Sequence, residues 1–406
     1  MTRNSTRLSM LVAAIVIFWS TLPTPALADT VSFVARRDYE AGQSPVSVVV
    51  GDFNGDGVPD LAVANELDLN LSGGTVEVLL GKDDGTFQAA RTVVAARARR
   101  TSIVAGDFNG DGVPDLAVAN GRTPFTGGPG NIEVLLGNGD GTFEEARTFS
   151  AGERPRSVAV GDFNGDGHAD LAVANQFSNT VTVLLGKGHG TFQKPVAFAA
   201  GTGPASLAVG DFNGDGHADL AVANFGSNTV SVLLGNGDGT FQAPLTVAPV
   251  NIPTSVAVDD FNRDGKPDLA VTNLRPVGSV SVLLGNGDGP FQAPLILTTG
   301  TRSVSVAAGD FNGDGVPDLA VANNGEPTFG HRGNVSVLVG NGDGTFRAPS
   351  TVVTANTPTA VVVGDFNGDG KPDLAVANVN SNNVSVLLGN GDGTFEAARN
   401  FGADVA

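Results

Sequence analysis

The feature that most constrains this chain is a sequence motif repeated at intervals of 49 to 55 residues. The motif Gly-Asp-Phe-Asn-Gly-Asp-Gly-x-x-Asp-Leu-Ala-Val-Ala-Asn, or a close variant, begins at Gly51, Gly106, Gly161, Gly210, Asp259, Gly309 and Gly364. A fixed period of this length is typical of an array of one structural unit. The seven copies therefore predict seven equivalent units sharing one architecture, although 406 residues alone would suggest two or three domains.

Each unit also carries a second signature, Leu-Leu-Gly-x-x-x-Gly-x-Phe or a close variant. Fourteen of the 23 Phe occupy one of the two repeated positions, which indicates core residues rather than binding aromatics. In the third unit, period-two alternation predicts strands over 157–160, 170–174, 180–185 and 192–199. Four short strands in each of seven units, with no helical period, predict an all-β, seven-bladed β-propeller with four antiparallel strands per blade. A β-solenoid is the alternative, but its units are shorter and would not supply four antiparallel strands.

The two ends of the chain both offer a fourth strand to the last blade. Residues 33–39 and 395–401 each resemble the fourth strand of a unit, which gives eight such segments for seven blades. The sequence does not decide whether the N-terminal or the C-terminal segment closes the ring. We expect one of the two segments to be surplus.

The first 28 residues are typical of a secretory leader. Arg3 and Arg7 precede an apolar run over 10–19, and Ala26-Leu27-Ala28 forms a small-x-small cleavage site. A membrane anchor is the alternative, but the run is shorter than the roughly 20 residues that span a bilayer. We therefore expect a leader at 1–28, a propeller at 29–406, and a secreted or cell-surface protein without membrane insertion after cleavage. The chain has no Cys, which excludes disulfides and is consistent with a bacterial exported protein.

The net charge of −19 is concentrated in the repeated loops. Loss of residues 1–28 removes two Arg and no acidic residue, which brings the charge to −21. Twenty-one of the 42 acidic residues are Asp of the motif, three in each copy. A chain this acidic is not expected to bind nucleic acid or anionic membranes through general electrostatics.

The spacing inside the motif predicts a calcium site. In the third unit, Asp162, Asn164 and Asp166 place oxygen side chains at positions 1, 3 and 5, followed by a glycine that permits a sharp bend. The backbone carbonyl of His168 at position 7 and the carboxylate of Asp170 at position 9 complete a set of hard oxygen ligands, which suits Ca²⁺. The alternative is a metal-free Asx turn, because Asn-Gly and Asp-Gly are strong hairpin formers. Seven copies that keep all four side-chain ligands favour calcium, about seven ions per chain.

The predicted ligands occupy the same five positions in every copy. They are Asp52, Asn54, Asp56, Val58 and Asp60; Asp107, Asn109, Asp111, Val113 and Asp115; Asp162, Asn164, Asp166, His168 and Asp170; Asp211, Asn213, Asp215, His217 and Asp219; Asp260, Asn262, Asp264, Lys266 and Asp268; Asp310, Asn312, Asp314, Val316 and Asp318; and Asp365, Asn367, Asp369, Lys371 and Asp373.

Two departures from the repeats bear on this prediction. The fifth copy has Arg263 where the others have Gly and Asp259 in place of the leading Gly, so we expect it to bind with an altered affinity. In the second signature of the third unit, His189 replaces an Asp, which a strict metal role would not tolerate. That signature is therefore interpreted as a tight turn.

The two motifs together resemble the FG-GAP or VCBS-type repeat. They are similar to the repeats in the seven-bladed propeller of integrin α-subunits and in many bacterial surface and secreted proteins. The resemblance covers about residues 31–405. It implies a propeller with calcium held in the hairpin between the first and second strands of a blade, and it implies no single activity.

Loop lengths suggest where a partner would bind. The loops between strands two and three are long in units one, two and six, at 66–74, 121–130 and 324–333. Units six, seven, one and two are neighbours in a closed ring, so these loops would gather on one side of the face opposite the calcium loops. The candidate contacts are Arg122, Phe125, Phe329, His331 and Arg332. Neutral length variation is the alternative, because surface loops tolerate insertion.

Three classes of function compete. A calcium-stabilised scaffold for protein interaction or adhesion, with an unknown protein or glycan ligand, fits every feature. A lectin is the alternative, although Tyr39 is the only Tyr and the only Trp lies in the leader, which leaves little for stacking on a sugar. We do not expect an enzyme: Cys is absent, there are four His, and no nucleophile, phosphate-loop or zinc motif stands out.

Overall fold

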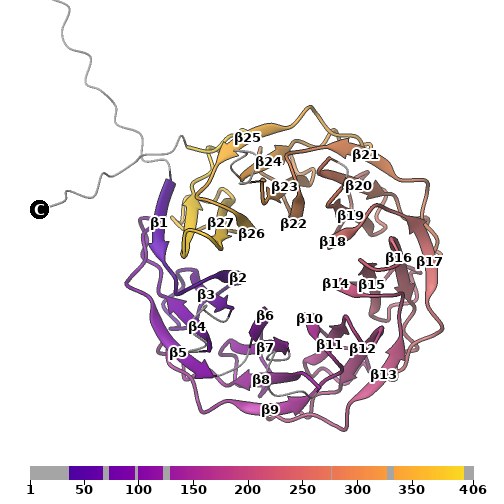
Figure 1. The fold of residues 1–406 in the computed structure, drawn as a ribbon, viewed down its shortest axis with the longest axis horizontal. Helices are drawn as coiled ribbons and strands as arrows, with labels where there is room; N and C mark the ends of the chain where they lie inside the picture. Colours follow the sequence, from indigo (N-terminus) through magenta and orange to yellow (C-terminus); the bar gives the residue numbers. More distant parts are fainter. Residues whose placement is uncertain are drawn as a thin grey trace, which may run out of the picture. The chain divides into compact units, whose positions relative to one another are not determined.

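The computed structural model describes residues 36–66, 73–96, 99–121, 129–275, 277–326 and 333–396. These residues form 28 strands in seven four-stranded sheets arranged as a ring (Figure 1). The predicted all-β, seven-bladed propeller is confirmed. Among the described residues there is no helix that is long and apolar enough to cross a membrane. The predicted leader lies outside the described residues.

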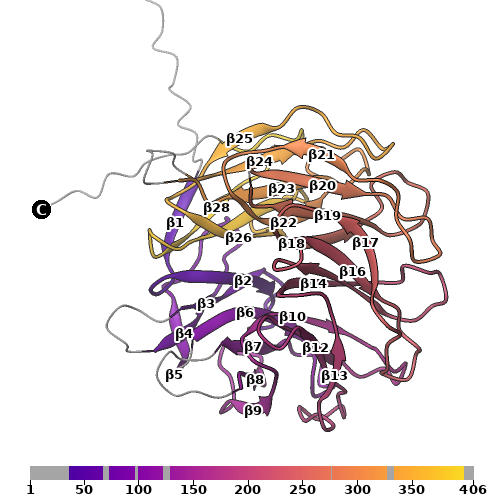
Figure 2. The same ribbon diagram turned by 45° about the vertical axis from the view of Figure 1, so that its right-hand side comes forward.

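Every blade has the same antiparallel order, from an inner strand near the ring axis to an outer strand at the rim (Figures 1 and 2). The inner strands are β2 (Pro45–Gly51), β6 (Arg99–Gly106), β10 (Pro155–Gly161), β14 (Pro204–Gly210), β18 (Pro253–Asp259), β22 (Ser303–Gly309) and β26 (Pro358–Gly364). The second strands are β3 (Asp60–Asn65), β7 (Asp115–Gly121), β11 (Asp170–Asn175), β15 (Asp219–Asn224), β19 (Asp268–Asn273), β23 (Asp318–Asn323) and β27 (Asp373–Asn378). The third strands are β4 (Gly74–Leu79), β8 (Asn131–Leu135), β12 (Thr180–Leu184), β16 (Thr229–Leu233), β20 (Ser279–Leu283), β24 (Asn334–Leu338) and β28 (Asn383–Leu387). The outer strands are β5 (Arg91–Ala96), β9 (Arg147–Ser150), β13 (Val196–Ala199), β17 (Leu245–Pro249), β21 (Leu295–Thr298), β25 (Ser350–Val353) and β1 (Arg36–Glu40). Blades 1 to 6 begin with β2, β6, β10, β14, β18 and β22, and blade 7 consists of β26, β27, β28 and β1.

The outer strands begin later than the sequence predicts. In blade 3 the predicted fourth strand starts at residue 192, whereas β13 starts at Val196. Phe192 forms an isolated bridge with Gly186 instead. The outer strands of blades 1 and 2 start at the same offset from the bridging Phe although Ala90 and Ala146 replace Pro195, so the bridge and not the proline marks where regular pairing is delayed.

The N-terminal strand closes the ring. β1 pairs antiparallel with β28, with Asp38 opposite Ser385 and Tyr39 opposite Val384. The last blade therefore takes its outer strand from the start of the chain, which decides between the two closures that the sequence left open. The alternative segment, 395–401, is described only as far as Glu396, and its Phe395 forms a bridge with Gly389.

The Leu-Ala-Val-Ala part of the motif builds the contacts between blades. Every residue of each second strand is buried. Between blades 1 and 2, Ala62 and Ala64 pack with Leu116 and Val118 in one cluster of buried residues. Between blades 7 and 1, Ala375 and Ala377 pack with Leu61 and Val63. Each blade thus presents its large residues to the small residues of the preceding blade, so the two faces interdigitate.

The two repeated phenylalanines also meet between blades. Phe53 of blade 1 contacts Phe143 of blade 2, with ring centroids 5.8 Å apart, and Phe366 of blade 7 contacts Phe87 of blade 1 at 5.7 Å. The same pairing recurs at the other five interfaces. The prediction that these phenylalanines are core residues is confirmed.

Serine hydroxyls link the inner strands around the ring, with one exception. Ser47 Oγ accepts a hydrogen bond from Ile103 N of the next blade at 3.2 Å, and Ser305 Oγ accepts one from Val361 N at 3.3 Å. Equivalent bonds join the intervening blades. In blade 7 the equivalent residue is Ala360, which has no hydroxyl to offer to Val48 of blade 1.

We expect Ala360→Ser to stabilise the propeller by about 1 kcal/mol, because one more hydrogen bond would form between blades 7 and 1. Chemical denaturation measures the change, and Ser305→Ala, which removes an existing bond, is the matched control of opposite sign. An unchanged or lower free energy of unfolding for Ala360→Ser would contradict the expectation.

A buried Asn ends every second strand and bonds to the third strand. In blade 3, Asn175 Nδ2 donates to Thr182 Oγ1 at 2.9 Å. Blade 2 departs from this pattern, because Arg100 stands where five other blades have Pro and Glu133 stands where five have Ser or Thr. Arg100 is fully buried, donates to Asn120 Oδ1 at 2.7 Å, and forms an ion pair with Glu133.

We expect Arg100→Met to destabilise the protein by about 3 kcal/mol, because it leaves the Glu133 carboxylate without its cation in a largely buried site. Thermal and chemical unfolding measure the loss. The double variant Arg100→Pro with Glu133→Ser gives blade 2 the residues of the other blades and should unfold close to wild type. Equal stability of Arg100→Met and wild type would show that the ion pair contributes nothing.

Candidate metal centre

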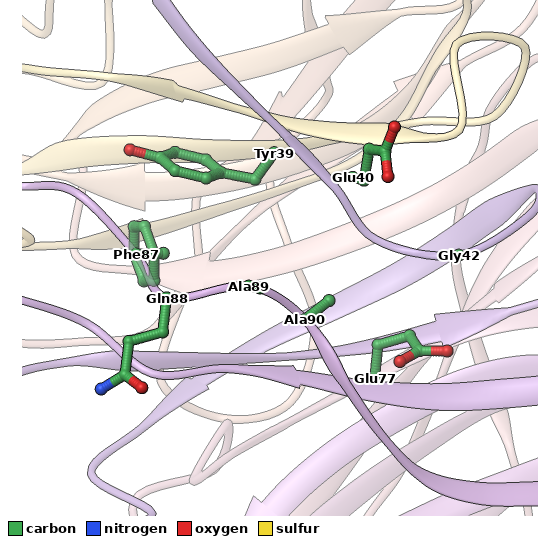
Figure 3. Close-up of a pocket in the computed structure, with 8 residues that line it drawn as sticks. All are labelled: Tyr39, Glu40, Gly42, Glu77, Phe87, Gln88, Ala89 and Ala90. Atoms are coloured by element: carbon green, nitrogen blue, oxygen red, sulfur yellow. The ribbon is translucent and has the colours of Figure 1, made fainter.

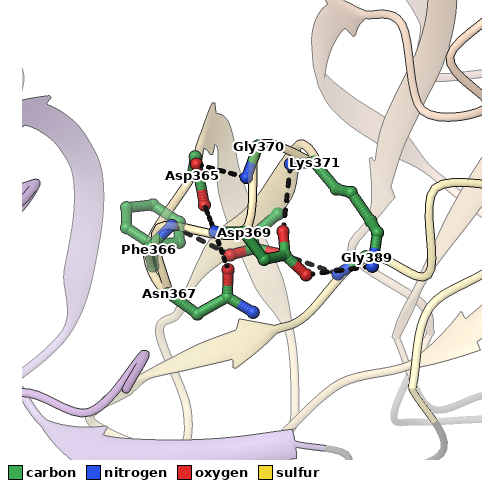
Figure 4. Close-up of polar contacts among 8 residues, drawn as sticks. Asp365, Phe366, Asn367, Asp369, Gly370, Lys371 and Gly389 are labelled. Carbon is green, nitrogen blue, oxygen red and sulfur yellow. Dashed lines mark hydrogen bonds and ion pairs between the residues drawn. The ribbon is translucent and has the colours of Figure 1, made fainter. Parts of the chain in front are cut away.

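The predicted calcium loops are the hairpins between the first and second strands of each blade, and Figure 4 shows the one in blade 7. Asp365 at position 1 accepts hydrogen bonds from Asp369 N at 3.1 Å and Gly370 N at 2.9 Å. Asn367 Oδ1 accepts from Asp369 N at 3.1 Å, and Asp369 Oδ1 accepts from Lys371 N at 3.0 Å. The side chains at positions 1, 3 and 5 therefore turn toward the backbone of their own loop, as in Asx turns.

Glycine permits the tight bend at positions 4 and 6. In blade 3, Gly165 has φ of 70° and Gly167 has φ of 79°, in the left-handed region that side chains disfavour. In blade 5, position 4 is Arg263, which adopts φ of 59° and donates from Nη2 to Asp314 O of the blade 6 loop at 2.6 Å. That contact between blades offsets the strain of a non-glycine residue there.

The carboxylate at position 5 already faces a positively polarised group in every loop. In five loops the Asn at position 3 donates from Nδ2 to its second oxygen, for example Asn54 to Asp56 Oδ2 at 2.8 Å. In blade 7, Lys371 Nζ lies 3.1 Å from Asp369 Oδ2, and in blade 5 Lys266 Nζ lies 3.8 Å from Asp264 Oδ2. The Asn amide groups and the Lys ammonium groups thus partly neutralise the carboxylate that a bound cation would otherwise neutralise.

The Asp at position 9 has a structural role that the sequence analysis missed. Asp373 is fully buried, and it accepts hydrogen bonds from Phe366 N at 2.9 Å and from Gly389 N at 2.7 Å. It therefore ties the loop to the turn between strands three and four of the same blade. The equivalent Asp makes the same two bonds in every other blade. A carboxylate offers about four lone-pair sites, so two acceptor sites remain for another partner.

Burial raises the pKa of these carboxyls. The pKa of Asp373 is raised to about 6, chiefly by burial, with smaller contributions from the charges of Asp369 and Asp365. The two backbone donors only partly offset this effect. The pKa is also raised to about 6 for Asp60, Asp115, Asp170, Asp268 and Asp318, and is raised for Asp219.

The side chain at position 7 lies over a neighbouring turn. A Cβ on Gly188 would come within 2.4 Å of His168 Cε1, and one on Gly237 within 2.4 Å of His217 Cε1. Glycine is required there because the imidazole rings rest on it. The candidate ligand at position 7 is therefore the backbone carbonyl. This agrees with the variation of the side chain there among Val, His and Lys, since every residue has the same carbonyl.

The donor atoms of the loops suit calcium, but their present arrangement does not form a coordination site. Each loop offers oxygen donors only, and its three carboxylates lie close enough to raise the pKa of the Asp at position 9. In the described part of the chain, however, no three His, Cys, Asp or Glu side chains are grouped so that they could hold a metal ion. Binding would require the side chains at positions 3 and 5 to turn away from each other. Calcium sites tolerate such adjustment, because Ca²⁺ accepts flexible oxygen geometry.

We expect the calcium-free protein to melt at a higher temperature at pH 5 than at pH 7. Six of the seven Asp at position 9 have a folded pKa of about 6, above the ordinary value of 3.8, and the pKa of Asp219 is also raised. For those six, the stability gained by protonation in the folded state is full below pH 3.8 and is lost as the pH rises through about 6. The expected gain is at least about 1 kcal/mol per loop. Melting curves in chelator measure it, and in saturating calcium the trend should reverse, because protons compete with the ion. A lower melting temperature at pH 5 in chelator would contradict this expectation.

The structure places the repeated loops and the Gly-rich turns on the same face. Gly141 N of blade 2 donates to Phe53 O of the blade 1 loop at 2.9 Å, and five further interfaces repeat this bond. The predicted partner contacts Arg122, Phe125, Phe329, His331 and Arg332 lie outside the described residues. The ring order does make blades 6, 7, 1 and 2 neighbours, as the loop-length argument requires.

Comparison with known proteins matches the repeats to one family. The profile of the FG-GAP-like repeat matches residues 66–118, 125–173, 162–222, 211–271, 260–321, 328–376 and 365–405, and that of the FG-GAP repeat matches residues 44–76. No curated protein matches the chain. Among solved structures, a functionally unknown protein from Desulfotomaculum acetoxidans is similar in fold, with 15% identity and a TM-score of 0.51. The match covers 76% of this chain and 89% of that one.

Proposed function

This chain belongs to the FG-GAP repeat family, and on that premise we propose that it is a secreted, calcium-binding propeller that serves as a scaffold for protein interaction or adhesion. The observation that carries the proposal is the sevenfold recurrence of one all-oxygen loop. Each copy keeps Asp at positions 1, 5 and 9 and Asn at position 3. Hydrogen bonds to the loop backbone account for part of this pattern, but each Asp at position 9 keeps two unused acceptor sites beside the oxygens at positions 1, 3 and 5, which favours a cation.

The proposed role of calcium is to stabilise the scaffold. Three carboxylates share one tight loop, and the buried one has a raised pKa. A divalent cation would neutralise this repulsion and cross-link the loop, with the residues at positions 1, 3, 5, 7 and 9 as its ligands. Within the described ranges, no cluster of side chains suggests bond-making chemistry, and we propose no enzymatic activity.

The test is a calorimetric titration of the chelator-treated protein with calcium. We expect about seven sites in the wild type and one fewer in the double variant Asp162→Asn with Asp166→Asn, because only the blade 3 loop loses its charge. Asp140→Asn and Asp238→Asn, which change exposed turn residues, form the matched control with the full number of sites. Equal site counts in all three proteins, or no binding, would reject the calcium assignment.

Partner recognition is proposed for the face opposite the calcium loops. A glycan array and a panel of surface proteins, each probed with and without calcium, separate the scaffold from the lectin alternative. Protein binding without glycan binding supports the scaffold, whereas saturable binding to a defined sugar supports the lectin. Exchange of the loop at 324–333 for the short loop of blade 3 should then abolish binding if this face is used.

A further inference from the structure

A cavity of about 440 Å³ lies at the seam where β1 closes the ring against blade 1. Tyr39 and Glu40 of β1 line one side. Glu77 of β4, together with Phe87 and Gln88 from the segment between β4 and β5, lines the other (Figure 3). A volume of this size is in the range of small-molecule sites. The cavity therefore combines two aromatic rings with two carboxylates.

Glu77 is an unusual residue for its position. Five other blades place Ser or Thr at the equivalent site of the third strand. Glu77 is only 7% exposed, and its two carboxylate oxygens accept hydrogen bonds from a single hydroxyl, Thr92 Oγ1, at 2.9 Å. The ion pairs among the described residues do not include it. A carboxylate buried to this degree is costly without a cationic partner.

Blade 2 shows what completes the same arrangement. There the equivalent residue, Glu133, is paired with Arg100, which also donates to Asn120 Oδ1 at 2.7 Å. One guanidinium nitrogen thus satisfies both the carboxylate and the amide oxygen.

In blade 1 that guanidinium is missing. Pro45 occupies the position of Arg100, and Asn65 occupies the position of Asn120. Asn65 is 1% exposed, and its Oδ1 is a buried acceptor without a hydrogen-bond partner. Blades 4 and 7 also leave the equivalent Asn oxygen unpaired, but they have Ser231 and Ser385 where blade 1 has Glu77. Only in blade 1 does an orphaned amide oxygen accompany an uncompensated carboxylate and an open cavity, among the residues that the structure describes.

We propose that this seam cavity binds a guanidinium group, with Glu77, which lines it, as the counter-ion. The ligand class is an arginine-like cation, either a free small molecule or the arginine side chain of a peptide. Tyr39 and Phe87, whose rings meet edge to face with centroids 5.2 Å apart, would contact its apolar portion. Glu40 adds a second negative charge at the cavity wall. This site goes beyond the proposed function and does not rest on calcium binding.

The test is a calorimetric titration of the whole chain, in calcium-containing buffer, with three probes. They are agmatine, a blocked Gly-Arg-Gly peptide, and the same peptide with neutral citrulline in place of arginine. We expect saturable binding of one or both cationic probes and at least about tenfold weaker binding of the citrulline peptide, because a charge-assisted hydrogen bond is lost. Tighter binding of agmatine points to a free ligand, and tighter binding of the arginine peptide points to a protein partner.

Two variants locate the site, and a third serves as control. Glu77→Ser introduces the residue found in four other blades and should lower the affinity for the cationic probes at least about tenfold. Pro45→Arg supplies the internal arginine of blade 2 and should abolish binding without lowering the melting temperature. Glu145→Ser, which removes an exposed carboxylate in blade 2, should bind like wild type. The proposal is overturned if neither cationic probe binds the wild type, if the citrulline peptide binds equally well, or if correctly folded Glu77→Ser retains wild-type affinity.

Discussion

Chelation of calcium is expected to lower the melting temperature of this propeller by on the order of 20 °C. An ion that binds only the folded chain stabilises it by mass action, by about 2.7 kcal/mol per site at a concentration 100 times the Kd. Seven independent sites that unfold together would contribute about 19 kcal/mol. The entropy of unfolding of a chain this long, about 2.1 cal/mol/K per residue, converts that contribution into the expected shift. Differential scanning calorimetry with and without excess chelator measures it.

The control for this experiment is ion identity. Magnesium at the same concentration should restore little of the stability, because Mg²⁺ demands a more regular octahedral site and gives up its water reluctantly. Extracellular sites often bind at about 10⁻⁴–10⁻³ M, so calcium at about 10–100 mM supplies the hundredfold excess over the Kd assumed above. A melting temperature that does not change on chelation would mean that the loops are turns held only by their own hydrogen bonds.

Deletion of residues 29–40 is expected to destabilise the ring by about 5 kcal/mol or more, because it removes the strand that completes blade 7. β1 forms a five-residue ladder with β28, and Ser385 Oγ donates to Asp38 Oδ1 at 2.6 Å. Tyr39 packs against Phe87 of blade 1, and Arg37 Nη1 donates to Asp84 O at 2.9 Å, so the strand also joins blade 7 to blade 1. Its loss would leave β28 as an exposed edge that can pair with other chains. Melting temperature and light scattering measure both effects.

Truncation after Glu396 is the matched control for that deletion. Because β1 already occupies the outer position of blade 7, we expect the truncated protein to melt close to the wild type. Comparable loss of stability in both truncations would show that both terminal segments contribute to closing the ring. Loss only in the C-terminal truncation would contradict closure by β1.

The repeat made most of the fold predictable. A fixed period, alternation within each unit and turn glycines at constant offsets gave seven four-stranded blades and the face that carries the Asp loops. The choice between the two terminal segments could not be predicted, because both have the pattern of a fourth strand and only the pairing of β1 with β28 distinguishes them. The late start of β13 follows the bridge between Phe192 and Gly186, which alternation does not reveal.

The candidate sites were predictable to different degrees. The loop ligands follow from the spacing of Asp and Asn, but the structural bonds of Asp373 to Phe366 and Gly389 do not, since Gly389 lies beyond the third strand of the blade. Glu77 had a weak signal, namely a charged residue where most repeats have Ser or Thr. Its meaning requires the fold, because ring closure brings Tyr39 and Glu40 of β1 to the same cavity.

The number of calcium ions per chain tests the central claim most directly. The chelator-treated protein is dialysed against millimolar calcium, and bound calcium is determined by elemental mass spectrometry against the calcium of the dialysis buffer. We predict about seven ions per folded chain, and one fewer in the blade 3 loop variant Asp162→Asn with Asp166→Asn. No calcium above the buffer level in a folded protein would contradict the account, and the 21 Asp carboxylates of the motif would then be explained as turn-forming residues alone.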